Sequence, residues 1–192
     1  MRIFCFYAVR VEGKKTIPEG PYIICANHTS YLDIFLLYSI LPEYRFLFLG
    51  KSEILSYPLV KTFFKNFNIP VYRKDRIKAA KSFIECKKAV EKGWSLAIFP
   101  EGGIPDENLP QMMEFKDGAF QLAKKCGVPI VNLTFINNYK LFSDPDHLFS
   151  PSSPGLSRVK FHPTMSKEEV AELSVSELKL KVRKQIESAI EV

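Results

Sequence analysis

The strongest constraint on the fold is an alternation of two hydrophobic patterns along the 192 residues. Short continuous apolar runs, typical of strands buried on both faces, alternate with stretches in which apolar residues follow helical spacing. The predicted strands cover residues 3–11, 22–26, 44–49, 69–72, 94–99, 128–135 and 158–162. The predicted helices cover residues 33–41, 57–66, 76–92, 115–125 and 166–190, and a loop is predicted at 143–155. This order predicts one α/β domain over residues 1–192, with a largely parallel or mixed central sheet flanked by helices.

The net charge of +6 fits three kinds of partner: nucleic acid, an anionic membrane surface or an anionic substrate. The chain has no helix-turn-helix, zinc-finger or RNP pattern, so we do not expect nucleic acid to be a partner. The longest apolar segment, residues 34–41, is far shorter than the ~20 residues that cross a bilayer. Apolar residues make up 46% and charged residues 25%, which indicates a globular chain.

One of the three histidines, His28, lies in the segment CANHTSYLD, between a predicted strand and a predicted helix. Ser30 and Asp33 have the Ser-x-x-Asp spacing of a capping box, which starts the helix near Ser30. The connecting turn can then fold the imidazole over the carboxylate, which accepts the proton of one ring nitrogen and leaves the other as a base. These residues alone leave two interpretations open: a catalytic pair, or a helix cap beside a structural histidine.

Metal chemistry is not expected from the remaining residues. Cys5, Cys25, Cys86 and Cys126 form no CxxC or Cys/His pattern, so we predict buried thiols in a reducing compartment. One histidine and one carboxylate also provide too few ligands for a catalytic metal.

Four segments in order carry a resemblance to a known family. NHTSYLD at 27–33 is followed by GKSEILSYPLVKTFF with IPVYRKD, then by FPEGG at 99–103 and by FKDGAFQLAKKCGVPIVNLTF at 115–135. They resemble the signature blocks of the glycerolipid acyltransferases, and most of all those of the bacterial 1-acylglycerol-3-phosphate (lysophosphatidic acid) acyltransferases. The resemblance covers about residues 9–135 and implies a glycerol-3-phosphate acyltransferase-like fold.

The resemblance implies a reaction in phospholipid synthesis. An acyl thioester, on coenzyme A or acyl carrier protein, would pass its acyl group to the free hydroxyl of lysophosphatidic acid and give phosphatidic acid. His28 would act as the general base on that hydroxyl, and Asp33 would orient the imidazole. No metal or further cofactor is implied.

The same blocks imply a set of substrate-binding residues: Asn27, Ser30, Lys51, Arg73, Glu101, Gly102, Gly103 and Lys116. The three basic residues would contact a phosphate, the glycines would let the backbone approach an anion, and Glu101 would organise the site. The third block departs from the family, because its usual Glu-Gly-Thr-Arg is Glu-Gly-Gly-Ile here. Two alternatives therefore stay open: acylation of a lyso-ornithine or lyso-glycine lipid, and a lipid-binding membrane protein without catalysis.

A membrane surface is the remaining expected partner. The family usually carries an N-terminal membrane-binding segment, which we expect to be missing or truncated in a chain that begins close to its first predicted strand. The stretch YPLVKTFFKNF interleaves Phe63, Phe64 and Phe67 with Lys61 and Lys65, a pattern that fits either the headgroup layer or the core. We expect a cytoplasmic protein, peripheral on the inner face of the cytoplasmic membrane.

Overall fold

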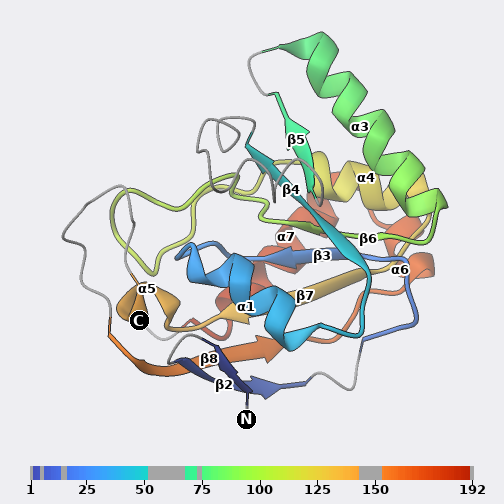
Figure 1. The fold of residues 1–192 in the computed structure, drawn as a ribbon. Coiled ribbons are helices and arrows are strands. Elements are labelled where there is room, and N and C mark those ends of the chain that lie inside the picture. The colour runs from blue at the N-terminus through green and yellow to red at the C-terminus, as the bar shows by residue number, and fades with distance from the viewer. Residues whose placement is uncertain are drawn as a thin grey trace.

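The computed structural model describes residues 2–4, 7–13, 17–51, 68–72, 75–142 and 153–190, and it confirms the predicted α/β class. Within these residues eight strands form one mixed sheet, in the order β1-β2-β8-β7-β3-β6-β4-β5 (Figure 1). The strands are β1 (Arg2–Phe4), β2 (Tyr7–Glu12), β3 (Ile23–Ala26), β4 (Phe46–Lys51), β5 (Asn68–Val71), β6 (Ser95–Ile98), β7 (Ile130–Phe135) and β8 (Gly155–Phe161). The helices are α1 (Leu32–Ile40), α3 (Arg76–Glu91), α4 (Gly118–Cys126), α5 (Asn138–Leu141), α6 (Lys167–Glu172) and α7 (Val175–Glu187).

Strand direction places the carboxyl ends of several strands at one edge of the sheet. β7, β3, β6, β4 and β5 are parallel to one another, so the carboxyl ends of all five meet at that edge. β8 pairs antiparallel with β7 and therefore begins at that edge. In open parallel sheets, ligands bind outside the carboxyl ends of the strands, so this edge is where a site is expected.

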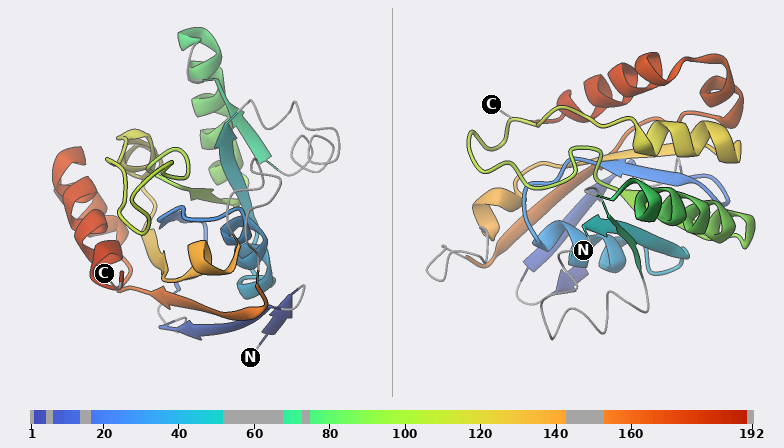
Figure 2. Two further views of the ribbon diagram at one scale, coloured as in Figure 1. Left: turned by 90° about the vertical axis from the view of Figure 1, so that its left-hand side faces the viewer. Right: turned by 90° about the horizontal axis from the view of Figure 1, so that it is seen from above.

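The core lies on both faces of the sheet, because side chains of the central strands alternate between them. In β3, Ile24 and Ala26 join the cluster that contains α1, whereas Ile23 and Cys25 join the cluster that contains α3, α4, α6 and α7. Figure 2 shows the same layering, with α1 on one side of the sheet and α4, α6 and α7 on the other. All four residues of β3 are buried, as the continuous apolar run predicts.

Local signals in the sequence fix several helix ends. The side chain of Asp75 caps α3 by accepting from the backbone N–H groups of Ile77 and Lys78. Gly127 ends α4 with φ 63°, in the left-handed region that glycine adopts readily. No helix formed by the described residues is both long enough and apolar enough to cross a bilayer.

Several predicted elements differ from the structure, and one lies outside the described residues. Residues 3–11 are two strands rather than one, since Phe4 of β1 pairs antiparallel with Tyr7 of β2. The helix predicted over 166–190 is two helices, because Ser174 and Glu177 form a capping box that starts α7. The helix predicted from 115 begins at Gly118, and α5 was not predicted. The helix predicted at 57–66, with its phenylalanines and lysines, lies outside the described residues.

Candidate active site

The loop after β3 is anchored to β7 by a single side chain. Asn27 donates from Nδ2 to the carbonyl oxygen of Phe135 at 2.9 Å, and its Oδ1 accepts from the Phe135 N–H at 2.8 Å. Both ends of this fully buried amide are thus bonded to the backbone of Phe135, the last residue of β7. Asn27 holds the loop in place, and the substrate contact that the resemblance implies for it stays a prediction.

His28 and Asp33 meet as the sequence predicts, with Nδ1 3.0 Å from Asp33 Oδ2. The same oxygen accepts from the backbone N–H groups of Thr29 and Ser30, at 2.8 and 2.9 Å. Because an ionised carboxylate only accepts, Nδ1 is the donor, and a neutral ring then carries its lone pair on Nε2. The two interpretations of the sequence are therefore combined: Asp33 binds the N–H groups ahead of α1 and also orients the imidazole.

Ser30 is committed to the protein rather than to a ligand. Its hydroxyl donates to the carbonyl oxygen of Phe142 at 2.7 Å and accepts from the N–H of Leu32 at 3.1 Å. The residue is 1% exposed, so a direct substrate contact, which the family blocks imply, would require these bonds to break. The expected capping box is half present. Asp33 accepts from the Ser30 N–H, but Ser30 Oγ accepts from the N–H of Leu32 instead of the N–H of Asp33.

A second polar chain extends behind Asp33. The other carboxylate oxygen, Oδ1, accepts from Nδ2 of Asn138 at 2.6 Å, and Asn138 Oδ1 accepts from the hydroxyl of Ser157 at 2.6 Å. All three side chains are fully buried. Asn138 is the first residue of α5 and Ser157 belongs to β8, so the dyad is supported by segments more than 100 residues away in the chain.

Glu101 lies beside the histidine, after the carboxyl end of β6. Its Oε1 accepts from the N–H of His28 at 2.9 Å and its Oε2 from the N–H of Met113 at 2.7 Å. The residue is 2% exposed, and this burial raises the pKa of its carboxyl to about 7 although both N–H bonds lower it. The nearby charge of Asp33 adds to the increase. Glu101 thus ties the His28 loop to the segment that leads to α4.

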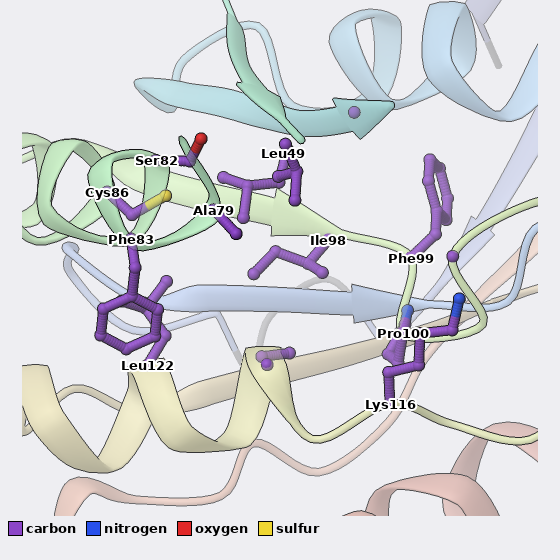
Figure 3. Close-up of a pocket in the computed structure, with 15 residues that line it drawn as sticks. Leu49, Ala79, Ser82, Phe83, Cys86, Ile98, Phe99, Pro100, Lys116 and Leu122 are labelled. Atoms are coloured by element: carbon purple, nitrogen blue, oxygen red, sulfur yellow. The ribbon is translucent and has the colours of Figure 1, made fainter. Parts of the chain in front are cut away.

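An apolar pocket of about 290 Å³ opens next to this dyad. It runs between α3 and α4 along β6, from Phe99, Pro100 and Lys116 at the carboxyl end of that strand toward Phe83 and Cys86 (Figure 3). The ring of Phe99 also stacks on the imidazole of His28, with centroids 3.9 Å apart and an interplanar angle of 8°. Phe99 therefore links the histidine to the mouth of the pocket.

The remaining predicted contacts are distributed around that mouth. Gly102 lines the pocket with φ 84° and its N–H donates to the carbonyl oxygen of Phe99 at 2.9 Å, while its contact with an anion stays a prediction. Gly103 follows it and does not line this pocket. Lys116 lies at the mouth (Figure 3). Lys51 ends β4 at the same edge of the sheet, and Arg73 lies outside the described residues.

The sequence did not point to Phe99, Asn138 or Ser157. A signal exists for the first two, because Phe99 ends a predicted buried strand and Asn138 follows another, and the carboxyl ends of parallel strands bring side chains together. Ser157 lies between the predicted loop and the last predicted strand, and nothing local marks it as a partner of the site. Among the described residues, no group of three or more His, Cys, Asp or Glu side chains lies together as metal ligands would. Cys25 and Cys86 are buried as predicted, whereas Cys126 is half-buried.

Comparison with known proteins assigns this geometry to a family. The family model described as Acyltransferase matches residues 8–136, more than half of the chain. A chloroplastic 1-acyl-sn-glycerol-3-phosphate acyltransferase of Brassica napus is 31% identical over 142 residues, which are 72% of this chain and 40% of that protein. A 1-acyl-sn-glycerol-3-phosphate acyltransferase of Saccharomyces cerevisiae is 30% identical over 190 residues, which are 97% of this chain and 61% of that protein. The chain thus spans less than two thirds of the length of these relatives.

A solved structure has the same fold. The 1-acyl-sn-glycerophosphate (LPA) acyltransferase PlsC from Thermotoga maritima superposes with a TM-score of 0.77 at 24% sequence identity, over 95% of this chain and 70% of that one. At this identity the likeness concerns the fold alone. The matched region of the family model contains the His28–Asp33 pair, Glu101 and both sides of the pocket. The chain belongs to the acyltransferase family.

Proposed function

We propose that the chain transfers a fatty acyl group from an acyl thioester to the free hydroxyl of lysophosphatidic acid, giving phosphatidic acid. One observation carries the proposal: the imidazole of His28, oriented by Asp33 at 3.0 Å, stacks on Phe99, a residue at the mouth of an apolar pocket. A base beside a pocket of methylene-binding character is what acyl transfer to an alcohol requires. The relatives named above, which act on 1-acyl-sn-glycerol-3-phosphate by their names, support the choice of acceptor.

In the proposed reaction the acyl chain enters the pocket and the thioester carbonyl stays at its mouth. The hydroxyl oxygen of the acceptor attacks this carbonyl as its proton moves to Nε2 of His28, and Asp33 stabilises the imidazolium. The tetrahedral intermediate then releases the thiol, which takes the proton back from His28 as the C–S bond breaks. The thioester, on coenzyme A or acyl carrier protein, is the co-substrate, and no further cofactor takes part.

The acceptor phosphate would approach the same edge of the sheet. Lys116 lines the mouth of the pocket, Lys51 is the last residue of β4, and Arg73 comes two residues after β5 in the sequence. Ile104 stands where the family signature has arginine, so a lyso-aminolipid remains the second candidate acceptor. A lipid acceptor also implies work at a membrane surface.

A surface of α3 fits that location. Ile77 and Ile84 are 72% and 54% exposed, and Lys81 and Lys88 lie on the same face of the helix, opposite the side chains that line the pocket. We call Ile77, Lys81, Ile84 and Lys88 the α3 ridge. The first turns of α3 project from the body of the domain (Figures 1 and 2). Contact of this ridge with anionic headgroups would hold the pocket close to the lipid.

The test measures thiol release and lipid product with acyl-CoA and acyl carrier protein donors. The acceptors are lysophosphatidic acid, lyso-ornithine lipid and lyso-glycine lipid, and His28→Ala is the matched inactive variant. We expect phosphatidic acid from the wild-type chain and a loss of ~10²–10⁴-fold in the variant, whose far-UV circular dichroism stays unchanged. Turnover that survives in a folded His28→Ala protein would refute the mechanism. Turnover with an aminolipid alone would show that the acceptor is the aminolipid and not lysophosphatidic acid. No turnover with any acceptor would favour a lipid-binding role.

A further inference from the structure

The contact of Asn138 with the back of Asp33 is the best-defined polar interaction that the proposed reaction does not use. Its Nδ2 lies 2.6 Å from Asp33 Oδ1, across a sequence separation of 105 residues. Both residues are fully buried, so solvent does not reach this hydrogen bond. An acceptor left without its donor in such a place costs free energy, which makes the contact consequential.

The orientation of the Asn138 amide follows from its two neighbours. A carboxylate only accepts hydrogen bonds, so the NH₂ end must face Asp33. At the other end, the hydroxyl of Ser157 donates to Asn138 Oδ1 at 2.6 Å, which suits the carbonyl end of the amide. An amide turned by 180° would direct its oxygen at the carboxylate and lose the bond to Asp33, whereas the Ser157 hydroxyl could still accept from the NH₂ end. Asp33 therefore fixes which end of Asn138 faces it, and Ser157 holds the other end.

Asp33 divides its two oxygens between two tasks. Oδ2 accepts from Nδ1 of His28 and from two backbone N–H groups, whereas Oδ1 accepts from Asn138. The Asn138 bond thus resists rotation of the carboxylate about its Cβ–Cγ bond, the motion that would take Oδ2 away from the imidazole. We propose that Asn138 is a positioning residue for the His28–Asp33 pair, with Ser157 holding the carbonyl end of its amide. This inference rests on the proposed role of His28 as the base.

The place of α5 itself does not depend on that amide. The preceding residue, Asn137, donates to the carbonyl oxygen of Leu156 at 2.9 Å and accepts from the N–H of Arg158 at 2.9 Å, which ties the start of α5 to β8. Leu141 at the end of the helix is buried in the core that contains α1. Asn138→Ala should therefore remove the bond to Asp33 while α5 stays where it is.

The kinetic test compares Asn138→Ala with Asn132→Ala. Asn132 is an equally buried asparagine whose Nδ2 donates to Gln185 Oε1 at 2.6 Å, on β7 away from the dyad. We expect Asn138→Ala to lower kcat about ten- to a hundredfold, the effect of losing a hydrogen bond to a charged group, with KM of donor and acceptor changed less than about twofold. Asn132→Ala should lower the melting temperature and leave kcat near the wild-type value. Equal kcat losses in the two variants would overturn the proposal in favour of general destabilisation.

A coupling test separates positioning from an independent effect. If Asn138 acts through Asp33, Asn138→Ala should change kcat less than about twofold in a chain that already carries Asp33→Asn. A full ten- to hundredfold loss in that background would refute the inference. Ser157→Ala, which removes the donor of Asn138 Oδ1 but keeps the bond to Asp33, should give a smaller loss than Asn138→Ala, and a larger loss would contradict the proposed role of Ser157.

A readout without substrate keeps the inference separate from the proposed function. The chain has three histidines, His28, His147 and His162, so ¹⁵N resonances of the rings are assignable with single substitutions. Burial lowers the pKa of His162 to about 4, which makes its signal a non-titrating reference between pH 5.5 and 9. We expect Asn138→Ala to change the Nδ1 and Nε2 chemical shifts of His28, because its bond to Asp33 is loosened, and Asn132→Ala to leave them unchanged. An unchanged His28 signal in Asn138→Ala would overturn the inference even if the chain proved to acylate no acceptor tested.

Discussion

Replacing Glu101 by Gln tests how burial and hydrogen bonding compete beside the histidine. The carboxyl group is 2% exposed, which opposes its ionisation, while the N–H groups of His28 and Met113 favour it. Burial is the larger influence, and the pKa of Glu101 rises from 4.5 to about 7. The folded state therefore holds this proton more tightly than the unfolded state does.

The sign and size of the effect follow from that difference. Below about pH 4.5 the group is protonated in both states, so Glu101 carries no ionisation penalty in the folded chain. As the pH rises toward about 7, the unfolded chain loses its proton first and is favoured increasingly. At ~1.36 kcal/mol per pH unit, the gap of about 2.5 units between 4.5 and about 7 corresponds to a loss of roughly 3 kcal/mol, complete near pH 8. Glu101→Gln removes the titration and should remove this loss.

The assay is urea unfolding of the wild-type chain and of Glu101→Gln at pH 4, 5, 6, 7 and 8. We expect the free energy of unfolding of the wild type, relative to the variant, to fall by roughly 3 kcal/mol from pH 4 to pH 8. Glu107→Gln changes an exposed carboxylate of the same loop and should follow the wild type. A difference between wild type and Glu101→Gln that stays constant with pH, or grows in favour of the wild type, would show that the two N–H bonds outweigh burial.

Two further predictions concern the pocket and the α3 ridge. Ala79→Phe places a ring in the pocket, so kcat/KM for long acyl thioesters should fall roughly fiftyfold, the value of about three methylenes at ~0.8 kcal/mol each, while short thioesters change little. Ala80→Phe, on the exposed side of α3, is the control. An equal loss in both variants would contradict binding of the acyl chain in this pocket. The double variant Ile77→Ser/Ile84→Ser should reduce co-sedimentation with anionic vesicles and leave the free energy of unfolding nearly unchanged, because both side chains are exposed. Leu180→Ser on α7 is the matched exposed change, and vesicle binding that falls equally there, or resists the double variant, would count against the ridge.

The sequence predicted the fold class well because burial on both faces leaves a clear pattern. β3, β6 and β7 are buried along their length and appear as continuous apolar runs, and Gly93 and Gly127 follow the helices that they end. The two errors, one strand predicted over 3–11 and one helix predicted over 166–190, arise where the apolar pattern contains no information on the break. The apolar residues of β1 and β2 give no sign of which strand pairs with which, and the apolar stripe continues from α6 into α7 across the capping box at Ser174.

The candidate site divides in the same way. His28 and Asp33 are close in the chain, so a local turn and a helix start are enough to predict that they meet. Asn27 and Ser30 belong to the same motif, yet their side chains bind the backbone of Phe135 and Phe142. Which polar residue of a motif faces a ligand and which faces the protein depends on neighbours over 100 positions away, and no local pattern contains them. The same holds for Asn138 and Ser157.

Strand register explains why Phe99 contacts the imidazole of His28 and also lies at the mouth of the pocket. In the pairing of β3 with β6, Cys25 is level with Ile98, so continuing the two chains brings His28 level with Glu101, in agreement with the 2.9 Å bond between them. Phe99 and His28 then lie on neighbouring segments at the same edge, close enough for their rings to stack. A slip of one residue would move His28 by ~3.3 Å along the sheet and turn its side chain to the opposite face. The alternating burial of Ile23, Ile24, Cys25 and Ala26 between two cores prevents that slip, so the packing of β3 also sets the geometry of the base.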